Sequence, residues 1–272
     1  MPHKFYHIKM KTILDTIVAN KQKEVALLKQ TKSYRDFENA PLFARKSISL
    51  TSRILSQEFG IIAEIKRKSP SAGNIKPNLD ITAQGLLYQN NGVAGISCLT
   101  DFLFFGGTIS DLETLREAVN VPILRKEFII DEIQLFEAKA VGADAILLIS
   151  EILDSQQALH LTIMAQQLGL EVIMECHDKH HLDLINDQVD IIGINNRNLH
   201  LQKTDLATSF ELFPYLPKDK ILISESGIKT QSEILELEKT GYHGALIGES
   251  ILTKTDSNKF FHSLQKPQAY ES

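Results

Sequence analysis

The sequence of this 272-residue chain predicts an α/β fold in which eight parallel strands close into a (β/α)8 barrel, the TIM barrel architecture. From residue 61 onward, short runs rich in Ile, Val and Leu recur eight times, each followed by a longer amphipathic stretch. Nearly continuous apolar strands that alternate with helices are typical of a parallel sheet covered by helices. Eight such units in roughly 200 residues fit a barrel, whose usual size is about 250 residues.

The first predicted element is an amphipathic helix at residues 13–30, where Ile13, Ile17, Val18, Val25 and Leu28 recur at helical spacings with charged residues between them. Residues 31–59 predict a polar connection that contains a second helix and a turn. Because neither segment has enough apolar residues for a core of its own, we expect an N-terminal helical extension at 1–59, a barrel at 60–272 and one structural domain in all.

The eight predicted strands follow at 61–66, 93–100, 121–128, 144–150, 170–176, 190–196, 220–226 and 244–250. Several intervening helical stretches end at Gly, and the segments AVGADAILLIS and KTGYHGALIGES repeat the same order of helix end, Gly and strand. A repeated βα unit fits a closed barrel. The alternative is an open doubly wound sheet, which usually carries G-x-G-x-x-G after its first strand, whereas KRKSPSAG stands here.

The composition of the chain limits the kinds of function that it can have. The chain is 43% hydrophobic with a formal charge of -5, which suits a soluble globular protein and offers no basic surface for nucleic acid. Its two cysteines, Cys98 and Cys176, stand next to apolar residues, so neither a disulfide framework nor a thiolate metal site is expected. No apolar run approaches the roughly 18 residues of a membrane span, and MPHKFYHIKMK lacks a signal-peptide core. We expect a cytoplasmic protein without membrane contact.

The first strand raises the question of function because the apolar run IIA leads directly into EIKRKSPS. Side chains alternate along a strand, so Glu64 and Lys66 share one face while Ala63 and Ile65 share the other. The opposite phasing would bury the charges against helices at a large cost in free energy. Glu64 and Lys66 are therefore predicted to point into the barrel mouth, where TIM barrels place their active sites.

Other strands end with the same chemical character: Arg125-Lys126-Glu127, Glu175, Asn195-Asn196-Arg197, Ser224-Glu225-Ser226-Gly227 and Gly248-Glu249-Ser250. Lysines and carboxylates that converge on one pocket perturb each other's pKa values and divide the acid and base roles. Salt bridges that tie together the top layer of the barrel are the alternative, but so many such ends favour a site. SESGI and IGES place Gly and small residues after the last two strands, where TIM barrels commonly bind a phosphate group. A phosphorylated small molecule is the expected ligand.

The segments IIAEIKRKSPSAGNI, LTDFLFFGG, PILRKEFIID, IGINNRNL, SESGI and ALIGES, in this order, resemble the indole-3-glycerol-phosphate synthase family of tryptophan biosynthesis. The stretch ILDTIVANKQKEVALLK resembles the helical extension of that family, which implies that residues 1–59 pack on the barrel mouth. The family are carboxy-lyases that convert 1-(2-carboxyphenylamino)-1-deoxyribulose 5-phosphate to indole-3-glycerol phosphate, carbon dioxide and water. The resemblance implies general acid/base catalysis without cofactor or metal.

The resemblance also implies catalytic roles. Lys126 would be the general acid on the substrate carbonyl, and Glu175 an acid/base group in the later dehydration. Lys66 would be the partner of Lys126 or its competitor as an acid. Glu64 would hold both lysines and the positive charge that develops on nitrogen, and Asn195 would orient a hydroxyl group or the leaving water.

The remaining implied residues bind substrate. Arg197 and Ser69 are the candidates for the anthranilate carboxylate, because a planar guanidinium matches a carboxylate. Phe105 would pack on the anthranilate ring. The ribulose-phosphate end would be formed by Glu225, Ser226, Gly227, Gly248 and Glu249. Of Glu249 we expect only the backbone N–H to serve, with its carboxylate pointing away from the phosphate.

Two alternative functions stay open from the sequence. A Schiff-base aldolase type of enzyme would use a neutral Lys126 as nucleophile. A non-catalytic protein would bind the phosphorylated ligand without turnover. The cluster His177, His180 and His181 in CHDKHH suggests a metal site, but a solvated helix start is the expected structure. A monomer or weak homo-oligomer is expected.

Overall fold

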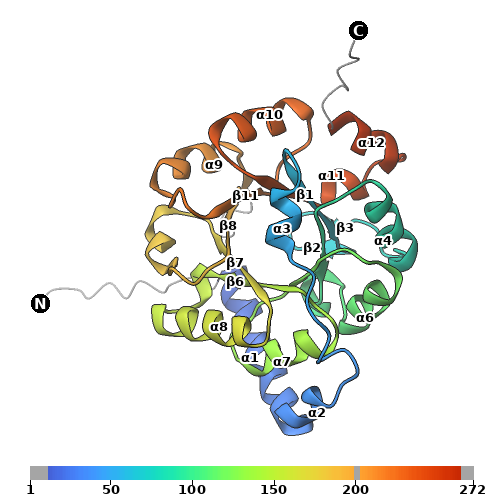
Figure 1. The fold of residues 1–272 in the computed structure, drawn as a ribbon, viewed down its shortest axis with the longest axis vertical. Helices are drawn as coiled ribbons and strands as arrows, with labels where there is room; N and C mark the ends of the chain where they lie inside the picture. The colour runs from blue at the N-terminus through green and yellow to red at the C-terminus, as the bar shows by residue number, and fades with distance from the viewer. Residues whose placement is uncertain (1–11, 199–202, 265–272) are drawn as a thin grey trace, which may run out of the picture.

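The computed structural model describes residues 12–198 and 203–264, and its centre is a closed barrel of eight parallel strands in the order β1-β12-β11-β8-β7-β6-β5-β4 (Figure 1). The first strand pairs with both the last one and β4, which closes the sheet. The predicted fold class is confirmed, and each predicted strand is found, most of them shorter than predicted. The strands are β1 (Gly60–Ile65), β4 (Gly95–Leu99), β5 (Ile123–Lys126), β6 (Ala145–Ile149), β7 (Glu171–Cys176), β8 (Ile191–Asn195), β11 (Ile221–Glu225) and β12 (Gly244–Ile247).

Helices form a ring around the barrel (Figure 1). The α-helices of the ring are α4 (Ile81–Asn90), α6 (Ile109–Ala118), α7 (Ile133–Ala140), α8 (Ser155–Gln167), α9 (Ala207–Leu212), α10 (Gln231–Thr240) and α12 (Ser257–Leu264). Shorter helical segments are α5 (Phe102–Phe105), α11 (Glu249–Leu252), η1 (Ser150–Ile152), η2 (Lys179–Leu184) and η3 (Phe213–Tyr215). After β7 the described chain forms only the 3-10 helix η2, so the βα repeat is incomplete at that position.

Two short antiparallel hairpins follow barrel strands. The first pairs β2 (Lys68–Ser69) with β3 (Gly73–Asn74), directly after β1. The second pairs β9 (Arg197–Asn198) with β10 (Lys203–Thr204), directly after β8. Sequence patterns do not predict these hairpins, because two-residue strands carry no measurable periodicity.

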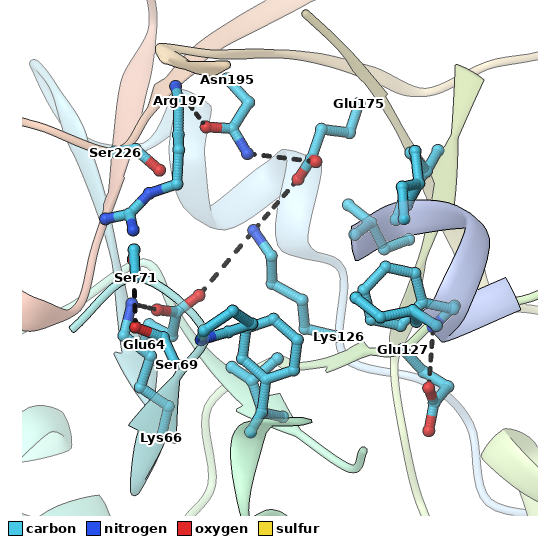
Figure 2. A pocket seen from close by; sticks show the side chains of 18 of the residues that line it. Glu64, Lys66, Ser69, Ser71, Lys126, Glu127, Glu175, Asn195, Arg197 and Ser226 are labelled. Carbon is cyan, nitrogen blue, oxygen red and sulfur yellow. Dashed lines mark hydrogen bonds and ion pairs between the residues drawn. The ribbon is translucent and has the colours of Figure 1, made fainter. Parts of the chain in front are cut away.

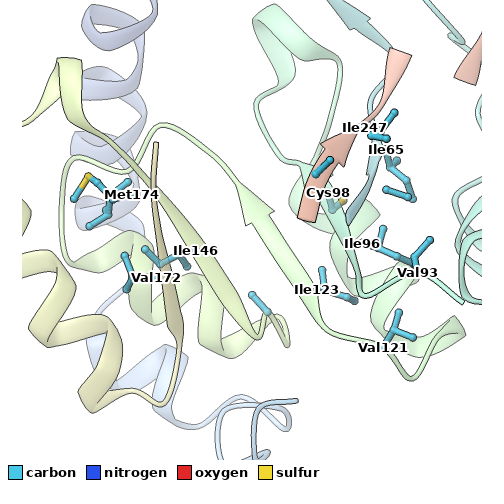
Figure 3. Close-up of a cluster of buried hydrophobic side chains, with 14 of the residues drawn as sticks. Ile65, Val93, Ile96, Cys98, Val121, Ile123, Ile146, Val172, Met174 and Ile247 are labelled. Carbon is cyan, nitrogen blue, oxygen red and sulfur yellow. The ribbon is translucent and has the colours of Figure 1, made fainter. Parts of the chain in front are cut away.

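The apolar side chains form two main clusters on opposite faces of the barrel strands. One packs between strands and helices and includes Ala63, Ile65 and Cys98 (Figure 3). The other fills the inside of the barrel and includes Ile62 and Leu147. The predicted phasing of β1 is therefore correct: because Ile62 points inward, Glu64 two residues later points inward as well.

The N-terminal segment consists of α1 (Ile13–Thr31), α2 (Tyr34–Glu38) and α3 (Leu50–Leu55). Thr12 and Asp15 form a capping box that starts α1. Leu14 of α1 packs on the inside cluster and lines the cavity at the mouth. Ile54 of α3 belongs to the same inside cluster but lies against Gly60, where β1 begins. The segment thus contacts the barrel interior at both ends, with α1 at the mouth.

Cys98 and Cys176 are free and buried. Burial raises the pKa of Cys98, and it raises the pKa of Cys176 to about 12, so both thiols stay protonated and act as packing groups. None of the helices in the described part of the chain has the length and hydropathy needed to cross a membrane.

Candidate active site

The carboxyl ends of the barrel strands bring one lysine and three carboxylates together at the mouth. Figure 2 shows this lysine, Lys126, with two of them, Glu64 and Glu175. The Lys126 ammonium of β5 forms ion pairs with Glu225 of β11, with Glu175 of β7 at 3.2 Å and with Glu64 of β1 at 3.8 Å. All three carboxylates are buried and the Lys126 side chain is 14% exposed. The predicted convergence of charged strand ends is therefore present in the structure.

Polar neighbours complete this cluster. Lys66 lies 2.5 Å from the Oε1 atom of Glu64, so Glu64 touches both lysines. The amide of Asn195 donates a hydrogen bond to Oε1 of Glu175 at 3.1 Å, and its carbonyl oxygen accepts one from the backbone N–H of Arg197 at 2.9 Å. Asn195 is thereby fixed with its donor toward Glu175.

The cluster sets the ionisation of its members. Burial alone would lower the pKa of Lys126, but Glu225, Glu175 and Glu64 raise it above the usual 10.5, so the lysine is charged. Burial favours the neutral form of Glu175, yet Lys126 and His177 lower the pKa of this carboxyl to about 2. Burial and the negative Glu175 raise the pKa of Glu225 to about 8, against the opposing effect of Lys126. Of these two neighbouring carboxyls, Glu175 is therefore the one favoured to ionise and Glu225 the one favoured to keep a proton.

Two glycines leave space for the carboxylates. A Cβ atom on Gly248 would lie 2.4 Å from Oε1 of Glu64, and one on Gly193 would lie 2.3 Å from Oε1 of Glu225. Atoms this close overlap, so any larger residue would displace a carboxylate. Gly248 was predicted only as part of a phosphate site, and Gly193 was not predicted because a single glycine within an apolar strand carries no signal for function.

Ser226, directly after Glu225, has a φ of 69°. The other described residues with a positive φ are glycines. Such strain is held by surrounding structure and concentrates at functional sites. The buried amide of Asn196 supplies the restraint, because it donates to the carbonyl oxygens of Glu225 at 2.9 Å and Ser226 at 3.0 Å. Asn196 thus shapes the loop rather than contacting a ligand.

Two adjoining cavities open beside the cluster and share Glu64, Lys66, Arg197 and Ser226. The first has an apolar part, formed by Ile13, Leu14, Ile17, Leu99, Phe105, Phe128, Leu147 and Ile149. The second, about 450 Å³, is bordered by polar loop residues that include Gly227, Lys229, Gly248, Glu249, Ser250 and Lys254. The site can hold a molecule with an apolar group at one end and an anion at the other.

The predicted binding residues other than Glu225 border these cavities. Glu225 is fully buried and contacts Lys126 instead. Phe105 faces Phe128 with ring centroids 6.0 Å apart. Ser69 is buried and its hydroxyl accepts the N–H of Ala72 at 3.1 Å. Arg197 lies 3.5 Å from Oε2 of Glu249, so the guanidinium holds this carboxylate.

Several charged residues of the same strand ends lie outside the cluster. Arg67 holds Asp111 with two nitrogens at 2.5 and 2.8 Å, which anchors the loop after β1 to α6. Arg125 pairs with Glu137 at 2.6 Å, and Glu127 pairs with Lys21 of α1 at 2.9 Å. These ion pairs fasten loops and helices to the barrel.

The expectation for the CHDKHH segment is partly wrong. Asp178 caps η2 as expected of a helix start, and His180 is exposed. The side chain of His177, however, is only 7% exposed and lies between Glu151 and Glu175. Ligand atoms of Glu151, Asp178 and His181 lie within 4.8 Å of one another and are spaced for a cation, but Asp178 and His181 already bond each other at 2.9 Å.

Comparison with known proteins decides the family. The sequence profile of indole-3-glycerol phosphate synthase matches residues 14–264. The indole-3-glycerol phosphate synthase of Bacteroides thetaiotaomicron is 45% identical over 243 residues, which cover 89% of this chain and 94% of that protein. The chain belongs to the indole-3-glycerol phosphate synthase family. The resemblance inferred from the sequence is confirmed.

A second member of the indole-3-glycerol phosphate synthase family, from Hyphomonas neptunium, is 42% identical over 253 residues, covering 91% of this chain and 96% of that protein. Among solved structures, the tryptophan synthase α-subunit from the hyperthermophile Pyrococcus furiosus superposes with a TM-score of 0.57 at 15% identity, covering 76% of this chain and 98% of that one. This second likeness concerns the fold alone.

Proposed function

We propose that this chain catalyses the indole-3-glycerol phosphate synthase reaction and that the ion-pair cluster around Lys126 is its catalytic centre. The observation that carries the proposal is the meeting of an apolar cavity and a polar loop cavity at this cluster. The substrate 1-(2-carboxyphenylamino)-1-deoxyribulose 5-phosphate has the same order of parts: an aromatic ring, a ketone and a phosphate. Family membership supports this assignment.

The aromatic end would lie in the apolar cavity against Phe105 and Phe128, with Arg197 and Ser69 near its carboxylate. Binding there requires Arg197 to exchange Glu249 for the substrate, since Arg197 and Glu249 lie 3.5 Å apart. Because the substrate carboxylate takes the place of the Glu249 carboxylate, the positive charge of the guanidinium stays paired with a negative one.

The phosphate end would lie between the loops after β11 and β12. Glu249 and Ser250 begin α11, so their N–H groups have no partner within the helix and are available to an anion. The N–H of Gly227 and the side chain of Ser226 border the same cavity. The Glu249 side chain contributes nothing to phosphate binding in this arrangement, because a carboxylate and a phosphate carry charges of the same sign and repel each other.

Ring closure needs an acid at the ketone oxygen. The carbon of the aniline ring that bears the carboxylate attacks the ketone carbon, and Lys126 gives its proton to the oxygen. A lysine held by buried acidic groups is a weak acid, but a substrate carbonyl that takes the place of Glu225 beside Lys126 removes one neighbour that raises the pKa of the ammonium. Glu64, with Lys66 beside it, offsets the positive charge that develops on the aniline nitrogen.

The later steps need a base and an acid. Departure of carbon dioxide returns its bonding electrons to the ring. The new hydroxyl group then leaves as water with a proton from an acid, while a proton is lost from the neighbouring carbon to a base. Glu175, ionised, is placed for the base, and Asn195, bonded to it, orients the hydroxyl. The complete reaction takes up one proton, which returns to Lys126 from solvent.

The test is a cofactor-free assay. Purified protein is mixed with the carboxyphenylamino-deoxyribulose phosphate and a metal chelator, and indole fluorescence is followed together with carbon dioxide release. We expect both products in equal amounts. A ligand that binds without product would establish the non-catalytic alternative instead.

The Schiff-base alternative is tested on the same sample. Borohydride added with substrate traps an imine on a lysine. We expect no trapped adduct, because Lys126 is charged in the cluster and a charged amine is no nucleophile. A covalent adduct at Lys126 would establish the aldolase type of chemistry.

Location and assembly follow as further parts of the proposal. A phosphorylated substrate is charged and does not cross a lipid bilayer unaided, which favours the cytoplasm. We propose a monomer or weak homo-oligomer, and sedimentation at several concentrations measures it.

A further inference from the structure

His177 is a buried histidine that the reaction as derived above does not use. It follows β7, its side chain is 7% exposed, and each ring nitrogen faces a carboxylate. Nδ1 lies 2.7 Å from Oε1 of Glu151, and Nε2 lies 3.4 Å from Oε1 of Glu175. Of the described residues, His177 is not among those that border the two cavities at the mouth, so it reaches substrate only through Glu175.

We propose that His177 is a positioning residue of the synthase reaction: its imidazolium, anchored by Glu151, keeps the Glu175 carboxylate ionised and turned toward Asn195 and Lys126. The proposal rests on the function proposed above and adds a residue to it.

The geometry favours a doubly protonated ring, in which Nδ1 bonds Glu151 and Nε2, without a hydrogen-bond partner of its own, faces Oε1 of Glu175 at 3.4 Å. A carboxylate only accepts hydrogen bonds, and a neutral imidazole has one donor and one acceptor nitrogen. With Glu151 on one side and Glu175 on the other, a neutral ring would turn a lone pair toward a negative oxygen. Only the imidazolium offers a donor to both.

The charged groups around the ring favour the same state. Burial lowers the pKa of His177, but Glu151, Glu175 and Glu225 raise it above its usual 6.5. On the side of η2, Asp178 carries a negative charge beside His181, whose Nδ1 is 3.9 Å from Oε1 of Glu151.

The positive charge of His177 beside Glu175 serves the later part of the reaction. In the resting site Oε2 of Glu175 faces Lys126 at 3.2 Å, and Oε1 receives Asn195 and faces His177. Once Lys126 has given its proton to the substrate, Glu175 loses its main positive neighbour, and a buried carboxylate without one takes up a proton. His177 remains charged, so Glu175 stays a carboxylate and is ready as the base of the dehydration.

The test is the pH dependence of kcat in the variant His177→Asn. The Asn amide can still donate to Glu151 in the place of Nδ1, but it carries no charge and does not reach Glu175. We expect kcat to fall about tenfold and KM to stay unchanged. This loss is smaller than the roughly 10²–10⁴-fold that a general acid or base itself supplies. The acid limb of the kcat profile should move to higher pH, because Glu175 protonates more easily without the cation. The alkaline loss of activity caused by deprotonation of His177 should disappear.

Two further variants sharpen the result. His180→Asn changes an exposed histidine three residues away and should leave the profile as in the wild type. Glu151→Gln keeps His177 in place but removes a negative charge, so the alkaline limb should move to lower pH. Nitrogen NMR of labelled wild-type enzyme should show both nitrogens of His177 protonated at neutral pH.

A His177→Asn profile of wild-type shape would overturn the proposal, whether or not kcat or the melting temperature falls. A neutral His177 ring in the NMR spectrum at neutral pH would overturn it as well. An inactive wild type would contradict the proposed function itself, so the two failures are distinguishable.

Discussion

At the scale of single residues, the site shows how one cation shared among several acids separates their pKa values. Lys126 contacts both Glu175 and Glu225, and two negative charges side by side in a buried site are costly. Glu175 has additional positive and hydrogen-bonding neighbours in His177 and Asn195, so it is the one that ionises. Glu225 retains the proton, and the two carboxyls can serve different roles in one site.

The raised pKa of Glu225 predicts a pH dependence of stability. The carboxyl titrates at about 8 in the folded protein and at 4.5 unperturbed. Between these values the folded protein binds more protons than the unfolded chain, so the free energy of unfolding falls as pH rises from 4.5 to 8, by at most about 1.4 kcal/mol per pH unit for one proton. Glu225→Gln keeps the neutral shape and should flatten this decline.

Urea denaturation at intervals across this pH range measures the slope. Glu117→Gln, on the exposed surface of α6, is the matched control. An equally steep decline in Glu225→Gln and in the wild type would show that the proton lies elsewhere.

The proposed phosphate loops predict a binding defect in Ser226→Asp. A carboxylate at the border of the loop cavity repels a phosphate group, so KM should rise by about tenfold or more, the equivalent of roughly 1.4 kcal/mol. Ser226→Ala removes the hydroxyl group without adding charge and should raise KM much less than Ser226→Asp does. Steady-state kinetics on both variants decide the matter, and an unchanged KM in Ser226→Asp would place the phosphate elsewhere.

At the scale of elements, α1 is fastened to the mouth by a buried lysine. Lys21 is 3% exposed and lies 2.9 Å from Glu127 and 3.3 Å from Asp101. Burial alone would lower its pKa, but Glu127, Glu24 and Asp101 raise it. One turn before it, Ile17 packs on the inside cluster and lines the apolar cavity, so the ion pairs keep part of the cavity wall in place.

Lys21→Met should therefore destabilise the protein strongly, because it removes the cation beside the buried Asp101 and leaves the buried Glu127 with Arg125 alone, 3.9 Å away. The expected loss is roughly 3–5 kcal/mol, the range for removing one partner of a buried ion pair. Lys23→Met, on the exposed face of the same helix, should change stability by about 0.5 kcal/mol or less. Equal denaturation midpoints for the two variants would contradict the anchoring role.

Strand β1 and helix α1 show which side-chain environments the sequence predicts and which it does not. Alternation along β1 predicts that Glu64 points into the barrel, since the rule depends only on local geometry. Lys21 has the same appearance as the solvated lysines of α1, because the acids that bury it come from distant loops. His177 likewise resembles its exposed neighbours in CHDKHH until β7 and η1 bring Glu175 and Glu151 to it.

At the scale of the whole molecule, closure of the barrel makes the site. Glu64, Lys126, Glu175 and Glu225 come from strands spread over most of the chain, and parallel order places all their carboxyl ends at one mouth. The pattern of eight strands therefore predicts that these residues converge. It does not predict the close approach at Gly193, or the exchange partner Glu249 of Arg197, because both depend on side chains meeting across different strands and loops.

The central claim is that the Lys126 cluster performs chemistry rather than only holding the mouth together. The most direct measurement compares Lys126→Ala with the wild type in single-turnover rate and in substrate affinity, after thermal unfolding has shown that the variant is folded. We expect a rate lower by about 10²–10⁴-fold with nearly unchanged affinity, since general acid catalysis is worth this much. A wild-type rate of indole formation in folded Lys126→Ala would contradict it.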